Sequence, residues 1–468
     1  MIAQHNDALA SLVENDAQAV PIALVRSSEL DRFKAQAPDV LRQWIDAAGF
    51  QARRHTFLRL PGARHTLLVG LGDAFDRWSL SHLPHALGKG VYALDDALDA
   101  ATASTAALSW ALGAYRFDAY RSGGSPSLAR LCWPSRAERA CVDRASGAMA
   151  LGRDLINTPA NDLGPADLAA VAQTLATKFG AAVRTVVGDA LIEGNYPLIH
   201  AVGKGSARPP RLIDIVWGEP AAPRITLVGK GVCFDTGGLN LKPPSTMITM
   251  KSDMGGAATA LALATMIMAA QLPVRLRVLI PTVENSIGAG ACRPSDVVRS
   301  RKGLTVEIGD TDAEGRLILA DALAEGSSEH PDLLVDFATL TGAALAALGP
   351  DVPAMFCNDD ELAAALERAG RITGDPLWRL PLWQDYAENL QGKVADMTNL
   401  VSLTFGPTKM AGAIHAALFL ERFVEPGVSW VHIDTFGWNS QDRPGRPEGG
   451  EVRSLFAFFH LLQDRFAA

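Results

Sequence analysis

Residues 224–285 contain the pattern that decides the fold: RITLVGKG at 224–231, GGAATALALATMIMAA at 255–270 and VRLRVLIPTVEN at 274–285. The first and third runs are short, apolar and rich in β-branched residues, so they predict buried strands. The run between them is longer and rich in alanine and leucine, and it predicts a helix. A strand, a helix and a second strand in this order indicate parallel strands joined by a crossover helix.

The same alternation extends through the second half of the chain. RLIDIVWG (211–218), LLVDFATL (333–340) and VSWVHIDTFGW (428–438) are further β-rich runs, and GRLILADALAEGSSE (315–329) predicts another helix. We therefore expect an α/β fold whose mainly parallel sheet is flanked by helices. Ligand sites in such sheets lie at the carboxyl ends of the strands. Four polar residues follow predicted strands at such ends: Lys230, Glu284, Asp310 and Thr339.

Residues 1–145 predict a smaller α/β domain, and residues 146–468 predict the larger one. A chain of 468 residues is too long for one ordinary hydrophobic core, so two domains are expected. A predicted helix over Ala137–Leu155 carries the chain from the first domain to the second. The smaller domain alternates predicted strands and helices: VPIALVRS (20–27), SELDRFKAQAPDVLRQWIDAAG (28–49), TLLVGLGD (66–73) and ALDDALDAATASTAALSWALGAYRF (93–117).

Composition narrows the class of protein. The net charge is −8 and no stretch is dominated by lysine and arginine, so nucleic acid is not an expected partner, although a local patch stays open. The five cysteines show no CxxC spacing, which argues against a disulfide framework and a thiolate zinc site.

The first twenty residues lack the basic and apolar regions of a signal peptide. The longest uncharged run, Met254–Val274, is only weakly hydrophobic and predicts a buried helix in preference to a membrane span. We expect a soluble cytoplasmic protein.

Three acids two residues apart stand in DTDAEGRLILAD, at 310–321. In an extended segment, Asp310, Asp312 and Glu314 would point to one side. Their carboxylates would then repel and raise one another's pKa, and a bound multivalent cation would relieve this repulsion. A solvated acidic turn explains the same residues equally well. The spacing also resembles the first half of an EF-hand loop, but a strand-like segment precedes it where an EF-hand has a helix.

A second group of charged residues lies in glycine-rich turns. VGKGVCFDTGGLNLKP at 228–243 is not a P-loop, because it lacks the GK[ST] ending, and MKSDMGGAA follows at 250–258. With the acidic segment, these stretches bring together seven candidate site residues: Lys230, Asp235, Lys242, Asp253, Asp312, Glu314 and Arg316.

In order and spacing, these segments resemble the leucyl (cytosol) aminopeptidase family. The resemblance covers roughly residues 150–468, whereas the first 145 residues match only in size and general character. The segments that carry it are VGKGVCFDTGGLNLKP, MKSDMGGAA, DTDAEGRL and ATLTGA (338–343), with support from NTPANDLGPADLA (157–169), RPSDVV (293–298) and AGAIHAALFL (411–420).

The resemblance implies a role for each candidate residue. One divalent metal would be held by Lys230, Asp235, Asp253 and Glu314, and a second by Asp235, Asp312 and Glu314. Lys242 and Arg316 would be the catalytic cations, with Arg316 holding a bicarbonate ion that acts as general base. Met250, Thr339 and Leu340 fall where the family binds the first residue of the substrate.

The chemistry implied by the resemblance is metal-dependent removal of the amino-terminal residue of peptides, with a preference for apolar residues such as leucine or methionine. Two metals would activate a bridging water. Four carboxylates balance two divalent ions, and an oxygen-rich set with one amine suits Mn or Zn, possibly Mg. The family forms hexamers, so a homohexamer is expected. The alternative is a family member that acts mainly as a DNA-binding hexamer.

One position departs from the family pattern. The family usually has asparagine immediately before TDAEG, where this chain has Asp310. This carboxylate either joins the metal set or caps the turn through a local bond to the backbone. We favour the cap, because four carboxylates already neutralise two divalent ions and a fifth buried carboxylate would need its own partner.

Overall fold

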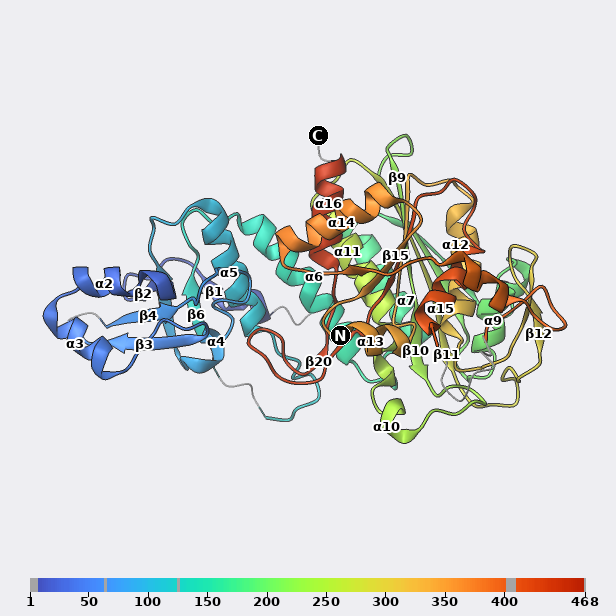
Figure 1. Cartoon of the computed structure of the whole chain (residues 1–468), viewed down its shortest axis with the longest axis horizontal. Coiled ribbons are helices and arrows are strands. Elements are labelled where there is room, and N and C mark those ends of the chain that lie inside the picture. The colour runs from blue at the N-terminus through green and yellow to red at the C-terminus, as the bar shows by residue number, and fades with distance from the viewer. Residues whose placement is uncertain (1–6, 63–64, 124–126, 401–409, 467–468) are drawn as a thin grey trace. The chain divides into compact units, whose positions relative to one another are not determined.

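The computed structural model describes residues 7–62, 65–123, 127–400 and 410–466. These residues form two compact units (Figure 1). One contains the described residues up to Ala150 together with Gln441–Glu448, and the other contains Leu151–Ser440 and the residues from Gly449 onward. The division lies within helix α6 (Arg139–Asn157). The boundary proposed at 145/146 lies in the same helix and stays a proposal.

The first unit is built on a six-stranded sheet with the order β1-β6-β5-β2-β4-β3. All its neighbouring strands are parallel except the edge strand β3, which runs antiparallel to β4. One apolar cluster gathers around Trp110 and another around Ile45. The elements are β1 (Leu12–Val13), β2 (Val20–Val25), β3 (Thr56–Leu60), β4 (Thr66–Gly70), β5 (Gly90–Leu94), β6 (Ala129–Cys132), α1 (Asp7–Ala10), η2 (Ser27–Glu29), α2 (Leu30–Gln36), α3 (Asp39–Ala47), α4 (Leu83–Ala86) and α5 (Ala100–Ala114).

Two predicted helices of this unit need correction. The helix expected over 28–49 is divided into α2 and α3 at Pro38, because proline disfavours helical dihedrals in the residue before it and lacks a backbone N–H. The helix expected over 93–117 begins only at Ala100, where the Asp99 side chain accepts a hydrogen bond from the Thr102 N–H. The first residues of that stretch belong to β5.

The second unit contains a nine-stranded sheet with the order β16-β15-β18-β14-β9-β11-β8-β7, and β10 pairs with β11. The central strands β18, β14, β9 and β11 are parallel, whereas β15, β8 and β7 introduce antiparallel pairs toward the edges. The mainly parallel sheet predicted from the sequence is therefore confirmed at its centre. The strands are β7 (Ala182–Val187), β8 (Arg211–Trp217), β9 (Arg224–Gly229), β10 (Gly231–Asp235), β11 (Arg275–Asn285), β14 (Leu333–Ala338), β15 (Ala354–Cys357), β16 (Trp378–Arg379) and β18 (Trp430–Asp434).

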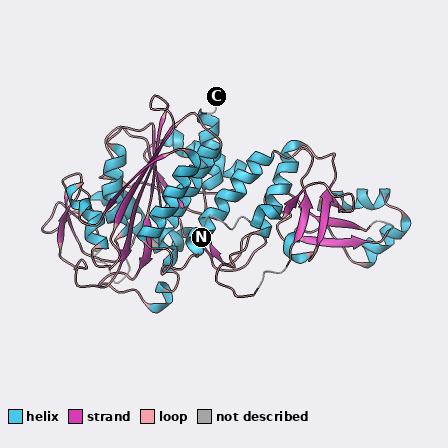
Figure 2. Cartoon of the chain, turned by 180° about the vertical axis from the view of Figure 1, so that it is seen from behind, coloured by secondary structure: helices cyan, strands magenta, loops and turns pink. Residues whose placement is uncertain are grey.

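Helices cover both faces of this sheet (Figure 2). Two smaller sheets, β12-β13-β17 and β19-β20, complete the unit. The helices are α7 (Pro165–Phe179), α8 (Ala190–Glu193), α9 (Pro197–Gly203), α10 (Pro244–Met247), η3 (Met250–Met254), α11 (Gly255–Ala269), α12 (Gly315–Ser327), α13 (Gly342–Leu348), α14 (Asp360–Thr373), η4 (Gln384–Leu390), α15 (Gly412–Glu421) and α16 (Leu455–Phe466). The small strands are β12 (Val297–Arg299), β13 (Thr305–Glu307), β17 (Met397–Thr398), β19 (Trp438–Asn439) and β20 (Gly449–Gly450).

Helix α11 begins directly against the central strands of the sheet. A Cβ at Gly256 would lie 2.0 Å from the Phe337 carbonyl oxygen, so only glycine permits this approach. The Ala257 N–H donates to the Lys230 carbonyl oxygen at 2.8 Å. The stretch Met250–Ala269 is long and apolar enough to cross a membrane, but most of it is buried within the unit, which is typical of a core helix. The buried helix predicted here is therefore confirmed.

Candidate metal centre

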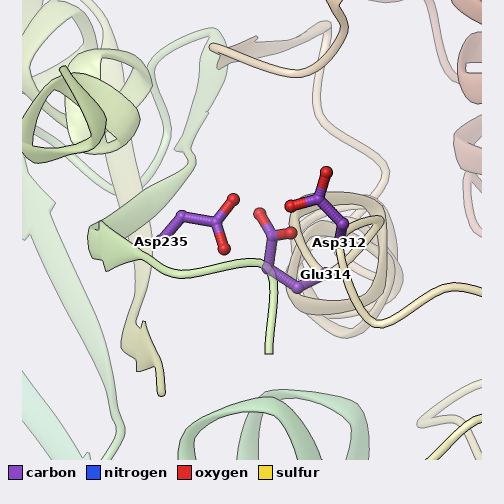
Figure 3. Close-up of side chains that lie close together, drawn as sticks. All are labelled: Asp235, Asp312 and Glu314. Carbon is purple, nitrogen blue, oxygen red and sulfur yellow. The ribbon is translucent and has the colours of Figure 1, made fainter. Parts of the chain in front are cut away.

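Three carboxylates from two separate parts of the chain meet at the carboxyl end of the central strands. Asp235 ends β10, and Asp312 and Glu314 immediately precede α12. One oxygen of each lies within 4.8 Å of the others, and the three side chains point toward one another (Figure 3). Asp235 Oδ1 accepts hydrogen bonds from the Gly237 N–H at 2.8 Å and from Asn285 Nδ2 at 2.7 Å, which fixes the carboxylate in place.

Lys230 and Asp253 extend this cluster on its buried side. Lys230 Nζ lies 2.7 Å from Asp253 Oδ1 and 3.0 Å from Glu314 Oε1, and it donates to the Thr339 carbonyl oxygen at 2.8 Å. The lysine passes over the start of α12 at Gly315, where a Cβ would lie 2.5 Å from its Cε. The absence of a side chain at Gly315 thus gives Lys230 its path into the cluster.

Lys242 lies on the more open side of the same cluster. Its Nζ is 2.8 Å from Asp235 Oδ2 and 2.6 Å from Asp312 Oδ1. The Asp312 side chain is 35% exposed, whereas the side chains of Asp235 and Glu314 are almost fully buried. The cluster is therefore partly open to solvent at Asp312 and closed by the protein around Asp235 and Glu314.

Burial and the charges of neighbouring carboxylates raise the pKa of Asp253, Asp312 and Glu314. Burial raises the pKa of Asp253 to about 6, and the Lys230 ammonium only partly opposes this. Burial and then the charge of Asp235 raise the pKa of Glu314 well above its ordinary value and also raise the pKa of Asp312. Burial alone would lower the pKa of Lys230 and Lys242, but neighbouring carboxylates outweigh it and raise both. The site thus favours additional positive charge.

The residues present fit divalent cations. Among the described residues, the buried oxygens Asp253 Oδ2 and Glu314 Oε2 have no hydrogen-bond partner. Buried carboxylate oxygens without a partner are costly, and a cation bound among them would satisfy them. Oxygen donors with one amine suit hard or borderline ions such as Mn, Mg and Zn.

The acidic segment does not have the extended form expected from the sequence. Residues 311–312 form a turn, and Glu314 has helical dihedrals, φ −74° and ψ −33°. The Asp310 side chain accepts the Asp312 N–H at 3.0 Å, which is the local cap favoured from the sequence. The EF-hand alternative is wrong, because β13 precedes the segment where an EF-hand has a helix and α12 begins inside the supposed loop.

Arg316 lies in the first turn of α12, close to the acidic cluster. Its Nη1 donates to the Asn399 carbonyl oxygen at 3.0 Å, and its Nε has no partner among the described residues. Burial lowers the pKa of Arg316, although Glu314, Asp310 and Asp434 oppose this shift. Arginine stays charged in proteins, so this guanidinium is a fixed cation with donor capacity left for a small anion.

Of the three residues expected to bind substrate, Thr339 contacts the buried side of the cluster directly. Thr339 is the most closely tied to it, because its Oγ1 donates to Asp253 Oδ1 at 2.8 Å and its carbonyl accepts from Lys230. The Leu340 N–H donates to Asp434 Oδ1 at 2.9 Å. Met250 begins η3, the short helix that contains Asp253, and its side chain is partly exposed.

Comparison with known proteins identifies the family to which the chain belongs. Residues 150–456, well over half of the chain, match the model of the cytosol aminopeptidase family, catalytic domain. The chain belongs to the cytosol aminopeptidase family. Residues 20–134 match the N-terminal domain of M17 aminopeptidases, so the family likeness extends over the first unit, which sequence reasoning had matched only in general character. The two-domain architecture is that of the family.

Curated relatives in the cytosol aminopeptidase family are similar over the larger unit. A probable cytosol aminopeptidase of Syntrophotalea carbinolica is 43% identical over 319 residues, 67% of this chain and 63% of that protein. A probable cytosol aminopeptidase of Chlamydia trachomatis is 46% identical over 292 residues, 61% of this chain and 57% of that protein. The matched part spans about three fifths of the length of these relatives.

Solved structures of cytosol aminopeptidase relatives match over nearly the whole chain. The crystal structure of the cytosol aminopeptidase from Coxiella burnetii has a TM-score of 0.93 and 47% identity, and the match covers 98% of this chain and 100% of that one. The bottromycin maturation enzyme BotP, solved in complex with Mn, has a TM-score of 0.86 and 35% identity, covering 96% of this chain and 100% of that one.

Sequence reasoning did not find three residues that organise the site of this cytosol aminopeptidase family member. Asn285 bonds Asp235 and the Thr311 carbonyl oxygen, Asp434 accepts the backbone N–H groups of Leu340 and Thr341, and Asn399 bonds the loop that carries Asp312. Asn285 and Asp434 each end a strand that the sequence predicted, which is a usable signal. Asn399 has no such signal, because the short strand before it, β17, was not predicted.

Proposed function

We propose that this protein is a metal-dependent aminopeptidase that hydrolyses the amino-terminal peptide bond of peptides. The observation that carries the proposal is the convergence of Asp235, Asp312 and Glu314 within 4.8 Å, with Lys230 and Asp253 on the buried side. The names of the relatives support it, since the protein shares their catalytic domain and nearly the whole fold of the Coxiella burnetii cytosol aminopeptidase.

Two divalent ions are proposed for the cluster. Four residues would hold the first ion, Lys230, Asp235, Asp253 and Glu314, and three would hold the second, Asp235, Asp312 and Glu314. When bound, the ions supply Lewis acidity that polarises the peptide carbonyl and lowers the pKa of a bridging water. Mn or Zn are the expected ions and Mg is a further option, with a Mn complex solved for the BotP enzyme.

Lys242 and Arg316 are proposed as the catalytic cations of the chain. The Lys242 ammonium lies beside Asp235 and Asp312, so it can stabilise the negative charge that develops on the carbonyl oxygen of the scissile bond. Arg316 has a free Nε donor among the described residues and is proposed to hold bicarbonate as the general base.

The first residue of the peptide is proposed to bind against Met250, Thr339 and Leu340. Met250 offers a flexible apolar surface, so leucine and methionine are expected as preferred amino-terminal residues. Thr339 bonds Asp253 and Lys230, so it joins the substrate surface to the proposed metal ligands. The positions of these groups support binding of a free amino terminus next to the metals.

The proposed setting is the cytoplasm, with peptides as substrates and a homohexamer as the assembly. The relatives are named cytosol aminopeptidases, which supports the location. The alternative of a DNA-binding hexamer has less support, because the net charge of −8 opposes association with a polyanion. Neither nucleic acid nor a membrane is expected as a partner.

Two assays on one preparation separate these functions. Hydrolysis of leucine amide in the presence of Mn²⁺ tests the peptidase, and a gel-shift with duplex DNA at physiological salt tests the alternative. The proposal expects turnover of leucine amide and no shifted band. A shifted band, together with no hydrolysis of leucine amide when the assay is run with Mn²⁺ and repeated with Zn²⁺ and with Mg²⁺, would favour the DNA-binding function over the peptidase.

A further inference from the structure

We propose that Asn399 is the positioning residue of the acidic loop. It fixes the positions of Asp312, Glu314 and Arg316 relative to one another. The inference rests on the proposed function insofar as these three residues act on metal and substrate. It adds a residue outside the acidic loop, from a different small strand, to the machinery of the site.

The Asn399 carboxamide makes four hydrogen bonds to the loop between β13 and α12. Its Oδ1 accepts the Gly309 N–H at 2.8 Å and the Asp310 N–H at 3.2 Å. Its Nδ2 donates to the Asp310 carbonyl oxygen at 2.7 Å and to the Ala313 carbonyl oxygen at 3.2 Å. The side chain is fully buried, so water cannot replace these bonds.

The fold delivers this amide by strand pairing. β17 runs parallel to β13 with Val306 opposite Met397 and Glu307 opposite Thr398, and the Asn399 N–H donates to the Glu307 carbonyl oxygen at 3.2 Å. Asn399 therefore follows β17 at the level where the neighbouring strand, β13, ends and the acidic loop begins. The three-stranded sheet thus places this side chain against the acidic loop.

The same residue also contacts the catalytic cation through its backbone. The Asn399 carbonyl oxygen accepts Arg316 Nη1 at 3.0 Å. The side chain thus holds the loop before Glu314, and the main chain holds the guanidinium two residues after it. A shift of this single residue would move the proposed ligands and the proposed anion site together.

Only an amide satisfies this loop, because two N–H groups and two carbonyl oxygens face the side chain at once. Asp in this position can accept both N–H groups, but it cannot donate to the carbonyl oxygens of Asp310 and Ala313. Asn399→Asp therefore keeps the shape of the side chain and removes its two donated hydrogen bonds, whereas Asn399→Ala removes all four side-chain hydrogen bonds. Both variants leave every proposed ligand in the sequence.

The test measures metal affinity of the full chain by competition with a chromogenic chelator, using Mn²⁺ and Zn²⁺. Loss of a residue that orients metal ligands costs about 10- to 100-fold in affinity. We expect weakening in this range for Asn399→Asp and at least as much for Asn399→Ala, together with a lower kcat on leucine amide. Thermal melting reports separately whether each variant is folded.

Asn358→Asp is the matched control. Its amide also acts both ways, since Nδ2 donates to the Val428 carbonyl oxygen at 3.0 Å and Oδ1 accepts the Trp430 N–H at 2.8 Å. Asn358 immediately follows β15, beside the start of the antiparallel neighbour β18, whereas the site lies at the carboxyl ends of the central strands. This variant is expected to keep metal affinity within about twofold of the unaltered protein.

Metal affinity of Asn399→Asp equal to that of the control would overturn the positioning role. Failure of both Asn399 variants to fold would also overturn it, because Asn399 would then be a requirement of the fold itself. If the unaltered protein binds metal but does not hydrolyse leucine amide, the proposed function fails, while weaker metal binding by folded Asn399 variants still supports the inference.

Discussion

The ammonium nitrogen of Lys242 lies 2.6 Å from Asp312 Oδ1. Asp312 is a proposed ligand of the second metal, and the proposed role of Lys242 beside it is to stabilise the negative charge that develops on the carbonyl oxygen of the scissile bond. Lys242 contributes no ligand atom in the proposed assignment. Its role and the binding of metal can therefore be separated by experiment.

Lys242→Ala and Arg316→Ala are expected to lower kcat by on the order of 10²-fold or more and to change KM much less, because both cations act on charge that develops during the reaction. Metal content should stay unchanged in Lys242→Ala. Added bicarbonate or another small anion should partly restore Arg316→Ala. Steady-state kinetics with leucine amide, beside elemental analysis of the same samples, provide the measurement.

Lys302→Ala is a suitable control for these two variants, because Lys302 pairs with Glu425 at 3.3 Å and donates to the Val424 carbonyl oxygen, away from the acidic cluster. Its kinetics should match those of the unaltered protein. A change confined to KM in both Lys242→Ala and Arg316→Ala would show that their roles are misassigned.

The identity of the first substrate residue should matter. Leucine and methionine amides are expected to be hydrolysed faster than glycine and aspartate amides, because Met250 offers an apolar surface that a methylene-rich side chain can cover. One additional buried methylene typically contributes about 10-fold or more to kcat/KM in such a contact. Equal kcat/KM values for the four amides would contradict an apolar surface for this residue.

Asp310→Asn should change kcat/KM by less than about tenfold, which corresponds to about 1.4 kcal/mol, and should leave metal content intact. Asp310 Oδ1 accepts the Asp312 N–H at 3.0 Å, and an asparagine oxygen can accept the same bond. Metal analysis and kinetics of this variant decide the point. Loss of one metal ion would place Asp310 among the ligands and make the ligand assignment incomplete.

Acid should destabilise the first unit through His82. Burial lowers the pKa of His82 to about 4, helped by the charge of His55, and neither ring nitrogen has a partner among the described residues. The unfolded chain binds a proton near the ordinary pKa of about 6.5, so the stability from neutral His82 is complete above that pH and is lost as the pH falls toward 4.

Between pH 7.5 and 4.5, the unaltered protein should lose about 2 kcal/mol more unfolding free energy than His82→Leu, which cannot bind the proton. Urea titrations of both proteins at the two pH values measure this difference. An equal loss in the two proteins would show that His82 is not held neutral by the fold.

Periodicity in the sequence was sufficient for the central parallel strands of the larger unit, but not for the antiparallel strands toward its edges or for the small sheets. The apolar runs at 224–231 and 274–285 form β9 and β11, which pair in parallel as predicted. Periodicity alone did not place the break at Pro38, where one proline overrides a helical pattern that is continuous on both sides. The ends of these helices depend more on local features, such as a proline or a capping side chain, than on the periodicity of apolar residues.

The candidate site was found in part from spacing and in part only from the folded chain. The acids of 310–314 were visible in the sequence, but their assumed extended form was wrong, and Asp310 uses its carboxylate within the turn. Asn399, the residue after β17, contacts that loop across 86 to 90 residues of sequence. Such a contact depends on the register of β13 and β17, which short strands without an alternating pattern do not reveal.

Hydrolysis is proposed to depend on divalent ions held by the cluster around Asp235 and Glu314. The most direct test measures bound metal and leucine amide hydrolysis on the same samples, as purified, after chelation, and after return of Mn²⁺ or Zn²⁺. Activity is expected to disappear with the metal and to return as about two ions bind per chain. A chelated protein that contains no divalent ion and still hydrolyses leucine amide at its original rate would contradict it.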